Sequence, residues 1–402
     1  MLTRPLATYL VTSFFARLAD EGMGVTVALL ALARTGDAAQ GAVVLTAWTA
    51  PHVVAAPLMG AFAARTRRPR ACYGGTLAVF AAGVAGVAGT VGRVPLVAVV
   101  AVAAVGGCCG PLVTGGMSSM LGGLVDADGR TRAYALDSAT YNAATLAGPA
   151  LGAVLTGAWS AGAATAALAG SAALAALGAA ALPIPRLGDS APPGLATAMV
   201  RGGTVIWRNG VLHGVTAGTC VAYLGIGALP VTAVLLAGSW SSARDGGLLM
   251  TAFAAGALVA AVGLARWRPT LPPERLAGYC LLGCTVALGL AAASPGLVVG
   301  LALFATAGAC DGPLLSATLA ARSQHAPAGS RPQVFTVGAA LKVSAAACGA
   351  GLVAVAADLL PALLLLGIAG TQLAGYAALR LLPRLPGSAA AGAHQLDHRG
   401  EA

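Results

Sequence analysis

The chain has 402 residues, of which 58% are hydrophobic and only 9% are charged. Soluble domains carry about 25% charged residues, so a chain this apolar cannot cover its surface with polar groups and belongs in a membrane. The formal net charge of +10 would suggest nucleic-acid binding in a soluble protein. Here the arginines lie between apolar runs, where they set topology and meet lipid headgroups. We therefore expect the lipid bilayer as a partner, and no nucleic acid.

The cysteines give no sign of a cofactor. All eight fall inside apolar runs, no Cys-x-x-Cys pair is present, and none stands at metal-ligand spacing from a histidine. Free cysteines usually serve as small buried packing residues. The sequence therefore predicts no metal site and no cofactor.

Apolar segments of helical length recur along the whole chain. Each is long enough to cross a hydrocarbon core that needs about 20 residues. We predict twelve of them, at residues 8–34, 40–63, 71–91, 94–116, 134–158, 160–182, 211–237, 246–265, 275–294, 296–320, 334–357 and 359–382.

The basic residues are unequally distributed between the two sides of the membrane. If both termini are cytoplasmic, the inner connections hold 18 basic residues and the outer ones 3. Lys and Arg are retained on the inner side, so this bias predicts a multi-pass protein of the cytoplasmic membrane with both termini inside. Charged residues interrupt the first apolar run, so we expect no cleavable signal there.

The longest polar interruption lies near the middle of the chain. It predicts four parts: an N-terminal six-helix bundle (1–182), a cytoplasmic central loop (183–210), a C-terminal six-helix bundle (211–382) and a disordered cytoplasmic tail (383–402). Internal repetition supports the division. Gly110-Pro111-Leu112 in the fourth segment recurs as Gly312-Pro313-Leu314 in the tenth, at an offset of 202.

A basic stretch, residues 60–70, joins the second and third segments. It resembles the G-x-x-x-D-R-x-G-R-R loop of the major facilitator superfamily. Four positions match in kind: Gly60, Arg65, Arg68 and Arg70. Ala64 stands where the family has Asp, and Arg67 where it has Gly. The resemblance implies an all-α integral membrane protein with twelve transmembrane helices in two six-helix pseudo-repeats, which works by alternating access.

A second motif lies on the fifth segment, where Gly148, Pro149 and Gly152 follow Asn142. It resembles the G-P-x-x-G motif of proton-coupled drug exporters in this superfamily. The resemblance implies export, and a fifth helix that packs against a helix of the other half. The resemblance of the loop at residues 60–70 implies in addition a cytoplasmic latch, in which Asp137 pairs with Arg65, Arg132 or another inner-side arginine.

Three charged residues share one face of the first segment, because Arg17 reaches Asp20 at i+3 and Glu21 at i+4. A charge inside a membrane is costly and is therefore usually functional. One hypothesis is that Asp20 or Glu21 is the proton-coupling carboxylate, with Arg17 favouring its charged form. The alternative is a self-neutralised cluster that fixes the rotation of the helix.

Asp311 in the tenth segment and Lys342 in the eleventh form a second pair of membrane charges. Both lie about 13 Å from the expected cytoplasmic ends at 1.5 Å per residue, so they are expected to face each other. They form either a structural pair that holds the C-terminal half together or a switch that alternates with proton or substrate occupancy.

Further polar side chains are candidates for a cavity wall. Tyr141 and Asn142 lie on the fifth segment. On the seventh, a one-sided stripe follows helical spacing: His213, Thr216, Cys220 and Tyr223. A histidine this close to a helix end is more typical of the membrane interface than of a chemical role.

Enzyme chemistry finds no support, since the chain has neither a P-loop nor an H-E-x-x-H helix. The prediction is therefore a monomeric secondary transporter that couples protons to efflux of a small molecule. The nearer alternative is a proton-coupled or uniport importer of a metabolite. The alternative from another class is a membrane-embedded lipid scramblase or enzyme.

Overall fold

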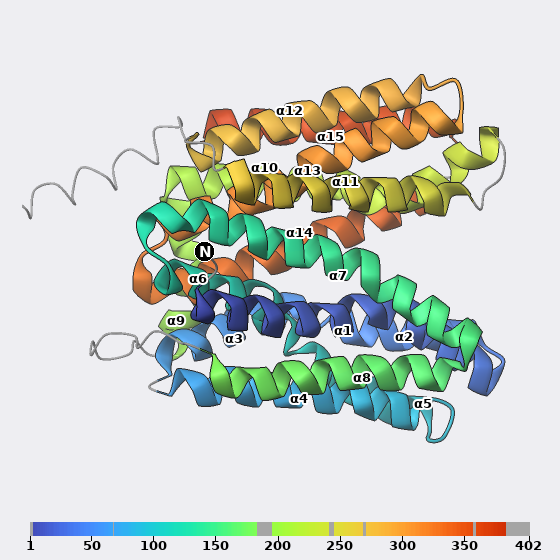
Figure 1. Ribbon diagram of the computed structural model, residues 1–402, viewed down its shortest axis with the longest axis vertical. Coiled ribbons are helices and arrows are strands. Elements are labelled where there is room, and N and C mark those ends of the chain that lie inside the picture. Colours follow the sequence, from blue (N-terminus) through green and yellow to red (C-terminus); the bar gives the residue numbers. More distant parts are fainter. Residues whose placement is uncertain are drawn as a thin grey trace, which may run out of the picture. The chain divides into compact units, whose positions relative to one another are not determined.

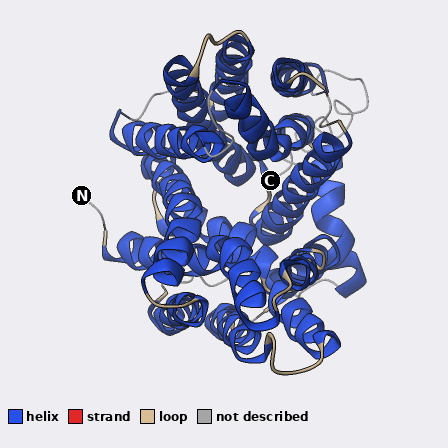
Figure 2. Cartoon of the chain, turned by 90° about the vertical axis from the view of Figure 1, so that its right-hand side faces the viewer, coloured by secondary structure: helices blue, strands red, loops and turns tan. Residues whose placement is uncertain are grey.

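In the computed structural model, every element of the described chain is helical (Figure 2). The described residues are 3–66, 68–182, 195–240, 245–267, 271–356 and 359–382. The α-helices are α1 (Arg4–Thr35), α2 (Ala38–Thr49), α3 (His52–Arg65), α4 (Pro69–Thr90), α5 (Leu96–Gly107), α6 (Met117–Leu124), α7 (Arg130–Ala158), α8 (Ala161–Gly178), α9 (Leu195–Arg208), α10 (Gly210–Trp240), α11 (Gly246–Trp267), α12 (Pro273–Ala292), α13 (Leu297–His325), α14 (Arg331–Val355) and α15 (Pro361–Leu381).

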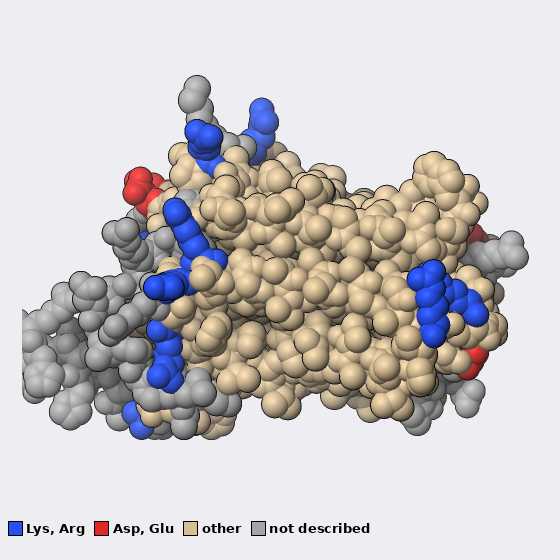
Figure 3. All heavy atoms as spheres, turned by 90° about the horizontal axis from the view of Figure 1, so that it is seen from below, with Lys and Arg blue, Asp and Glu red and all other residues tan. Residues whose placement is uncertain are grey.

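Ten helical segments of the described chain are long and apolar enough to cross a membrane. α1 and α7 lie outside that set, but have 32 and 29 residues and coincide with the first and fifth predicted segments. On the face seen in Figure 3, the visible Lys and Arg side chains gather at the two ends and leave between them a band without visible charged side chains. The predicted all-α membrane fold is confirmed.

Local breaks and extensions distinguish the observed helices from the predicted segments. The second segment is broken between α2 and α3, where Pro51 precedes the first residue of α3. The fourth continues beyond residue 116 through a π-helical turn at Leu112–Gly116 into α6, and the tenth continues to His325. Proline stands in the first turn of α4, α12, α14 and α15. It is tolerated there because a backbone N–H in the first turn has no intrahelical acceptor, so the N–H that proline lacks is not missed.

The predicted central loop contains a helix that the sequence interpretation did not include. Residues 195–208 of that loop form α9. The remainder of the loop before it, from 183 to 194, and the predicted tail 383–402 lie outside the described residues.

The chain divides into two compact units. Unit 1 consists of residues 1–133, 140–200 and 335–340, and unit 2 of residues 134–139, 201–334 and 341–402. In unit 1, α1 packs against α8 and α2, while α4 packs against α8 and α5 (Figure 1). In unit 2, α13 packs against α11 and α12, and α15 packs against α10 and α12.

Each unit is completed by a short segment from a helix that otherwise belongs to the other one. Residues 134–139 of α7 belong to unit 2, where the Ser138 hydroxyl donates a 2.7 Å hydrogen bond to the carbonyl of Gly312. Residues 335–340 of α14 belong to unit 1, where a Cβ added at Gly115 would collide with the backbone of Phe335. Residues 134–139 of α7 are therefore part of the packing of unit 2, and residues 335–340 of α14 are part of the packing of unit 1.

Glycine lets helices of unit 2 touch through their backbones. A Cβ at Gly256 of α11 would collide with the carbonyl of Ala305 in α13, and a Cβ at Gly312 of α13 would collide with the carbonyl of Ala257 in α11. Helices in lipid have little hydrophobic driving force for association, so van der Waals packing at such close contacts holds them together. We call this contact the α11–α13 seam.

Candidate functional site

Arg17 of α1 is the buried cation of unit 1, and its side chain is only 1% exposed. Its guanidinium donates hydrogen bonds to the hydroxyls of Ser118 (3.1 Å) and Thr140, which lie on α6 and α7. It also lies 3.5 Å from the centre of the Tyr141 ring, within the range of a cation–π interaction. A planar guanidinium has donors pointing in several directions, so this one side chain connects three helices.

The two acidic residues that follow Arg17 lie beside different helices. A carboxylate oxygen of Asp20 accepts a 3.0 Å hydrogen bond from the indole nitrogen of Trp48 on α2. Glu21 lies where α1 meets α7, since a Cβ added at Gly148 would come within 3.2 Å of the Glu21 Cβ. Asp20 is therefore engaged by an uncharged donor, and the clustering of Arg17 with both acids stays a prediction.

Asp311 and Lys342 are brought together in unit 2, and a tyrosine lies between them. Asp311 is 6% exposed and is close enough to Lys342 to interact with it electrostatically. The hydroxyl of Tyr223 on α10 donates to one carboxylate oxygen of Asp311 at 3.4 Å, and the Lys342 ammonium lies 4.3 Å from the centre of the Tyr223 ring. We call Asp311, Tyr223 and Lys342 the charged triad.

Only some residues of the predicted stripe on α10 lie at the charged triad. Tyr223 belongs to the charged triad, and Cys220, one turn earlier, is in electrostatic reach of Lys342. Thr216 is buried at 4% exposure. His213 instead stacks against Trp207 of α9, with ring centroids 4.6 Å apart, which fits the interfacial alternative for this residue.

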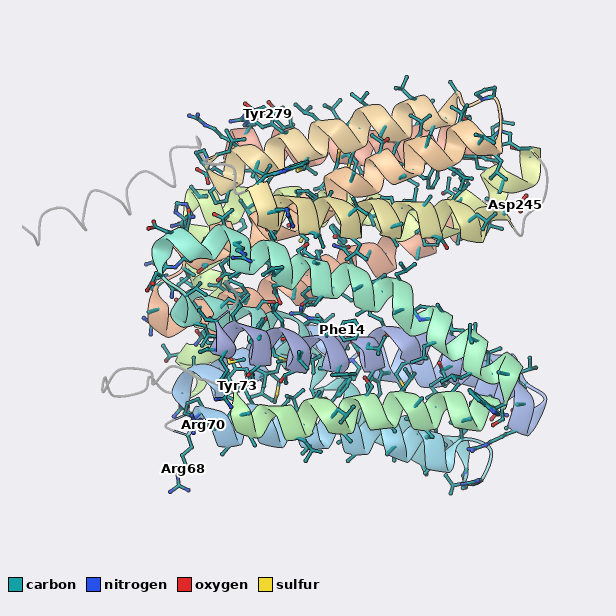
Figure 4. All side chains as sticks on the ribbon, in the orientation of Figure 1. Phe14, Arg68, Arg70, Tyr73, Asp245 and Tyr279 are labelled. Atoms are coloured by element: carbon teal, nitrogen blue, oxygen red, sulfur yellow. The ribbon has the colours of Figure 1, made fainter. Side chains whose placement is uncertain are left out.

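The basic stretch 60–70 is divided by its surroundings. Gly60 is buried in α3, and Arg65 ends that helix half-buried. Arg68 and Arg70 are exposed where α4 begins, and Figure 4 shows both at that end of unit 1. Arg67 lies outside the described residues. Asp137 is fully buried in the α7 segment of unit 2, and its pairing with an inner-side arginine stays a prediction.

The two glycines of the Gly148-Pro149-x-x-Gly152 motif face α1. A Cβ added at Gly148 would lie 2.7 Å from the backbone nitrogen of Gly22, and one at Gly152 would collide with the Thr26 hydroxyl. The resemblance implied that this motif packs the fifth helix against the other half. These two positions allow α7 and α1 of the same half to touch, and packing of the motif against the other half stays a prediction. Contacts of α7 within unit 2 come from its residues 134–139.

Comparison with known proteins identifies the family. No curated protein matches the sequence. The model of the Major Facilitator Superfamily matches residues 9–217, a little over half of the chain. The chain belongs to this superfamily.

Solved structures show the same superfamily fold over almost the whole chain. The human organic anion transporter MFSD10 (TETRAN) is 18% identical, with a TM-score of 0.73 over 94% of this chain and 99% of that one. A bacterial homologue of the iron transporter ferroportin, in an outward-facing state, is 15% identical, with a TM-score of 0.74 over 94% and 98%. The E. coli fucose:proton symporter FucP is 14% identical, with a TM-score of 0.73 over 94% and 98%. At these identities the likeness concerns the fold alone.

Three residues of the site in this superfamily member were not identified from the sequence. Ser118, Thr140 and Trp48 supply partners of Arg17 and Asp20. A serine or threonine inside a membrane helix more often bonds to its own helix, as Thr12 does to the carbonyl of Thr8. The adjacent pair Ser118-Ser119, inside an otherwise apolar run, is the one signal that could have indicated a polar contact there.

Proposed function

We propose that this protein is a secondary active transporter that exports a small molecule in exchange for protons by alternating access. Its two six-helix halves, 1–182 and 211–382, carry out the transport cycle. It acts as a monomer in the bacterial cytoplasmic membrane, with both termini inside. The observation that carries the proposal is the charged triad of unit 2.

Asp311 is the proton site in this proposal. A carboxylate inside a membrane is expensive when charged, unless a cation and hydrogen bonds compensate it. Lys342 and the Tyr223 hydroxyl supply that compensation here. Neutralising Asp311 with a proton removes its attraction to Lys342, so the proton changes the forces between α13 and α14.

The position of Asp311 links this change to the helix packing. The next residue, Gly312, contributes its carbonyl to the hydrogen bond from Ser138 and its missing side chain to the α11–α13 seam. Ser138 is fully buried and lies in the α7 segment that completes unit 2. A displacement of the backbone at Asp311 would therefore act directly on the contact that holds α7 in this unit.

Export as the direction is supported by the Gly148-Pro149-x-x-Gly152 motif, which resembles that of proton-coupled exporters. The drug-exporter branch is part of the proposal. The specific alternative is import, because two structures of the same fold are described as a proton:xylose symporter and a fucose:proton symporter. A transporter is favoured over an enzyme or scramblase because the family and all of these structural neighbours are transporters.

The test uses inside-out vesicles with an acid interior, a pH-sensitive dye and a panel of small molecules. We expect a substrate to collapse part of the gradient only when the protein is present. Asp311→Asn should abolish that response. Asp37→Asn, which alters an exposed carboxylate at the junction of α1 and α2, should preserve it. Substrate counterflow without any pH response would show transport but reject proton coupling. Substrate uptake into the vesicles that is driven only when their interior is alkaline would reject export in exchange for protons.

A further inference from the structure

Helix α9 is anchored to unit 2 along one of its faces. Ile206 is 6% exposed. A Cβ added at Gly202, one turn earlier, would lie 2.7 Å from the Cβ of Gln333 in the first turn of α14. Residues four apart lie on the same side of a helix, so these two positions fix which side of α9 faces the protein.

The opposite side of α9 is exposed and combines apolar with basic residues. Val200 and Trp207 are 67% and 71% exposed. They are seven residues apart and therefore point in nearly the same direction. Arg201 and Arg208 are also seven apart and exposed, and they follow the apolar pair by one position each. The helix thus presents an apolar ridge with a basic edge, and its sequence contains no acidic residue.

Trp207 contacts the first turn of a helix of membrane-spanning length. Its ring stacks on His213 with centroids 4.6 Å apart. His213 lies in the first turn of α10, which is one of the helices long and apolar enough to cross a membrane. Trp is enriched at the boundary between the hydrocarbon core and water. The exposed face of α9 therefore lies next to the first turn of a helix long and apolar enough to cross a membrane.

We propose that α9 is a docking helix for anionic lipid headgroups. Val200 and Trp207 enter the interfacial layer, and Arg201 and Arg208 bind the phosphates of anionic lipids in the inner leaflet. A basic edge beside an aromatic ridge fits this occupant, whereas a protein partner would need a face directed away from the membrane. This inference goes beyond the transport function and does not rest on it.

The experiment measures how close Trp207 lies to lipid in the reconstituted full chain. The purified protein is placed in nanodiscs of phosphatidylcholine with increasing phosphatidylglycerol, with bromine near the headgroup end of the acyl chains, which quenches tryptophan fluorescence. The difference between wild type and Trp207→Phe isolates the Trp207 signal. We expect this signal to be quenched, and the quenching to rise with the phosphatidylglycerol content.

Charge variants then test the arginines. Arg201→Gln with Arg208→Gln should weaken the phosphatidylglycerol dependence by about fivefold per arginine, whereas Arg201→Lys with Arg208→Lys should retain it. Trp267 at the end of α11 is the matched control, because it is also exposed, at 84%, and is next to an arginine. Its signal, isolated with Trp267→Phe, should not respond to changes in α9.

Two results would overturn the proposal. Quenching of the Trp207 signal by iodide in water, without quenching by the brominated lipids, would place α9 away from the membrane. The second result is lipid quenching that does not depend on charge. If quenching is the same with and without phosphatidylglycerol, and the same in the wild type and the double glutamine variant, headgroup charge plays no part. Trp207 is exposed, so its replacement leaves the packed face of α9 intact and both results can be obtained with folded protein.

Discussion

The two units each hold a cation against the face of a tyrosine, but they surround it differently. In unit 1, Arg17 lies 3.5 Å from the centre of the Tyr141 ring and donates to the hydroxyls of Ser118 and Thr140. In unit 2, Lys342 lies 4.3 Å from the centre of the Tyr223 ring, and that tyrosine donates to Asp311.

The difference separates a permanent fastening from a site that can change charge. Arg17 keeps its charge at any physiological pH, and serine and threonine hydroxyls do not titrate. The charged triad contains a carboxylate whose proton can come and go. We therefore assign structural cohesion to the Arg17 contacts and proton response to the triad, and the predictions below test this division.

The largest expected effect is on the triad. Asp311→Asn should abolish proton-driven transport, because an amide cannot bind and release the coupling proton. Substrate counterflow, measured in proteoliposomes without a gradient, should continue. Loss of counterflow together with loss of folded protein would instead make Asp311 a structural residue.

Lys342→Gln tests the same pair from its other side. It should destabilise the protein by about 3–5 kcal/mol, because it leaves a buried carboxylate without its cation. Thermal unfolding in detergent measures this change. The double variant with Asp311→Asn should recover stability but not coupling. If the double variant recovers full proton-driven transport, the triad is a structural pair and the division fails.

Arg17 should affect stability more than coupling. Arg17→Gln removes hydrogen bonds from a charged donor, which contribute about 1.5–3 kcal/mol each. Arg17→Lys should rescue only part of this loss, since an ammonium cannot reproduce the planar fork of donors. The measurement is the thermal midpoint compared with the ratio of protons to substrate transported. A changed ratio at unchanged stability would place Arg17 in the coupling machinery.

A smaller effect is expected where α7 touches α1. Gly148→Ala should lower the thermal midpoint and the transport rate, because the added Cβ would lie 2.7 Å from the backbone of Gly22 and force the helices apart. Gly157→Ala in the same helix is the matched control, since a Cβ there meets nothing within 4 Å. Equal behaviour of the two variants would show that the close contact is not needed.

The smallest effect is expected at Asp20. Asp20→Asn keeps an oxygen that can accept the hydrogen from the Trp48 indole, so stability should fall by no more than about 1 kcal/mol. Proton-driven transport should remain. If Asp20→Asn abolishes coupling while Asp311→Asn does not, the proton site lies in unit 1 and our assignment is reversed.

Much of the fold could be predicted because apolar length and basic residues mark membrane helices directly. The segment 94–116 ended too early because the sequence continues through the glycine pair Gly115-Gly116, which does not look like a helix interior. Helix α9 was missed because it is short and lies next to Pro-rich sequence. Its Val200, Trp207 and arginine spacing is visible only when the loop is examined at helical periodicity.

The part of the site that could be predicted is the part in which two residues lie at the same depth in the membrane. The positions of Asp311 and Lys342 along their helices predicted that they meet, and the stripe on α10 contained Tyr223. The partners of Arg17 could not be predicted, because Ser118 and Thr140 lie 101 and 123 residues away. Which hydroxyl meets a given arginine depends on the packing of three helices and leaves no local pattern.

The α11–α13 seam has a mechanical consequence for the triad. Backbones in direct contact at Gly256, Gly308 and Gly312 leave no layer of side chains that could yield between the two helices. Asp311 is therefore carried on a stiff two-helix slab, whereas Lys342 is carried on α14. In the proposed cycle, protonation of Asp311 would therefore move α11 and α13 together relative to α14, as one rigid body.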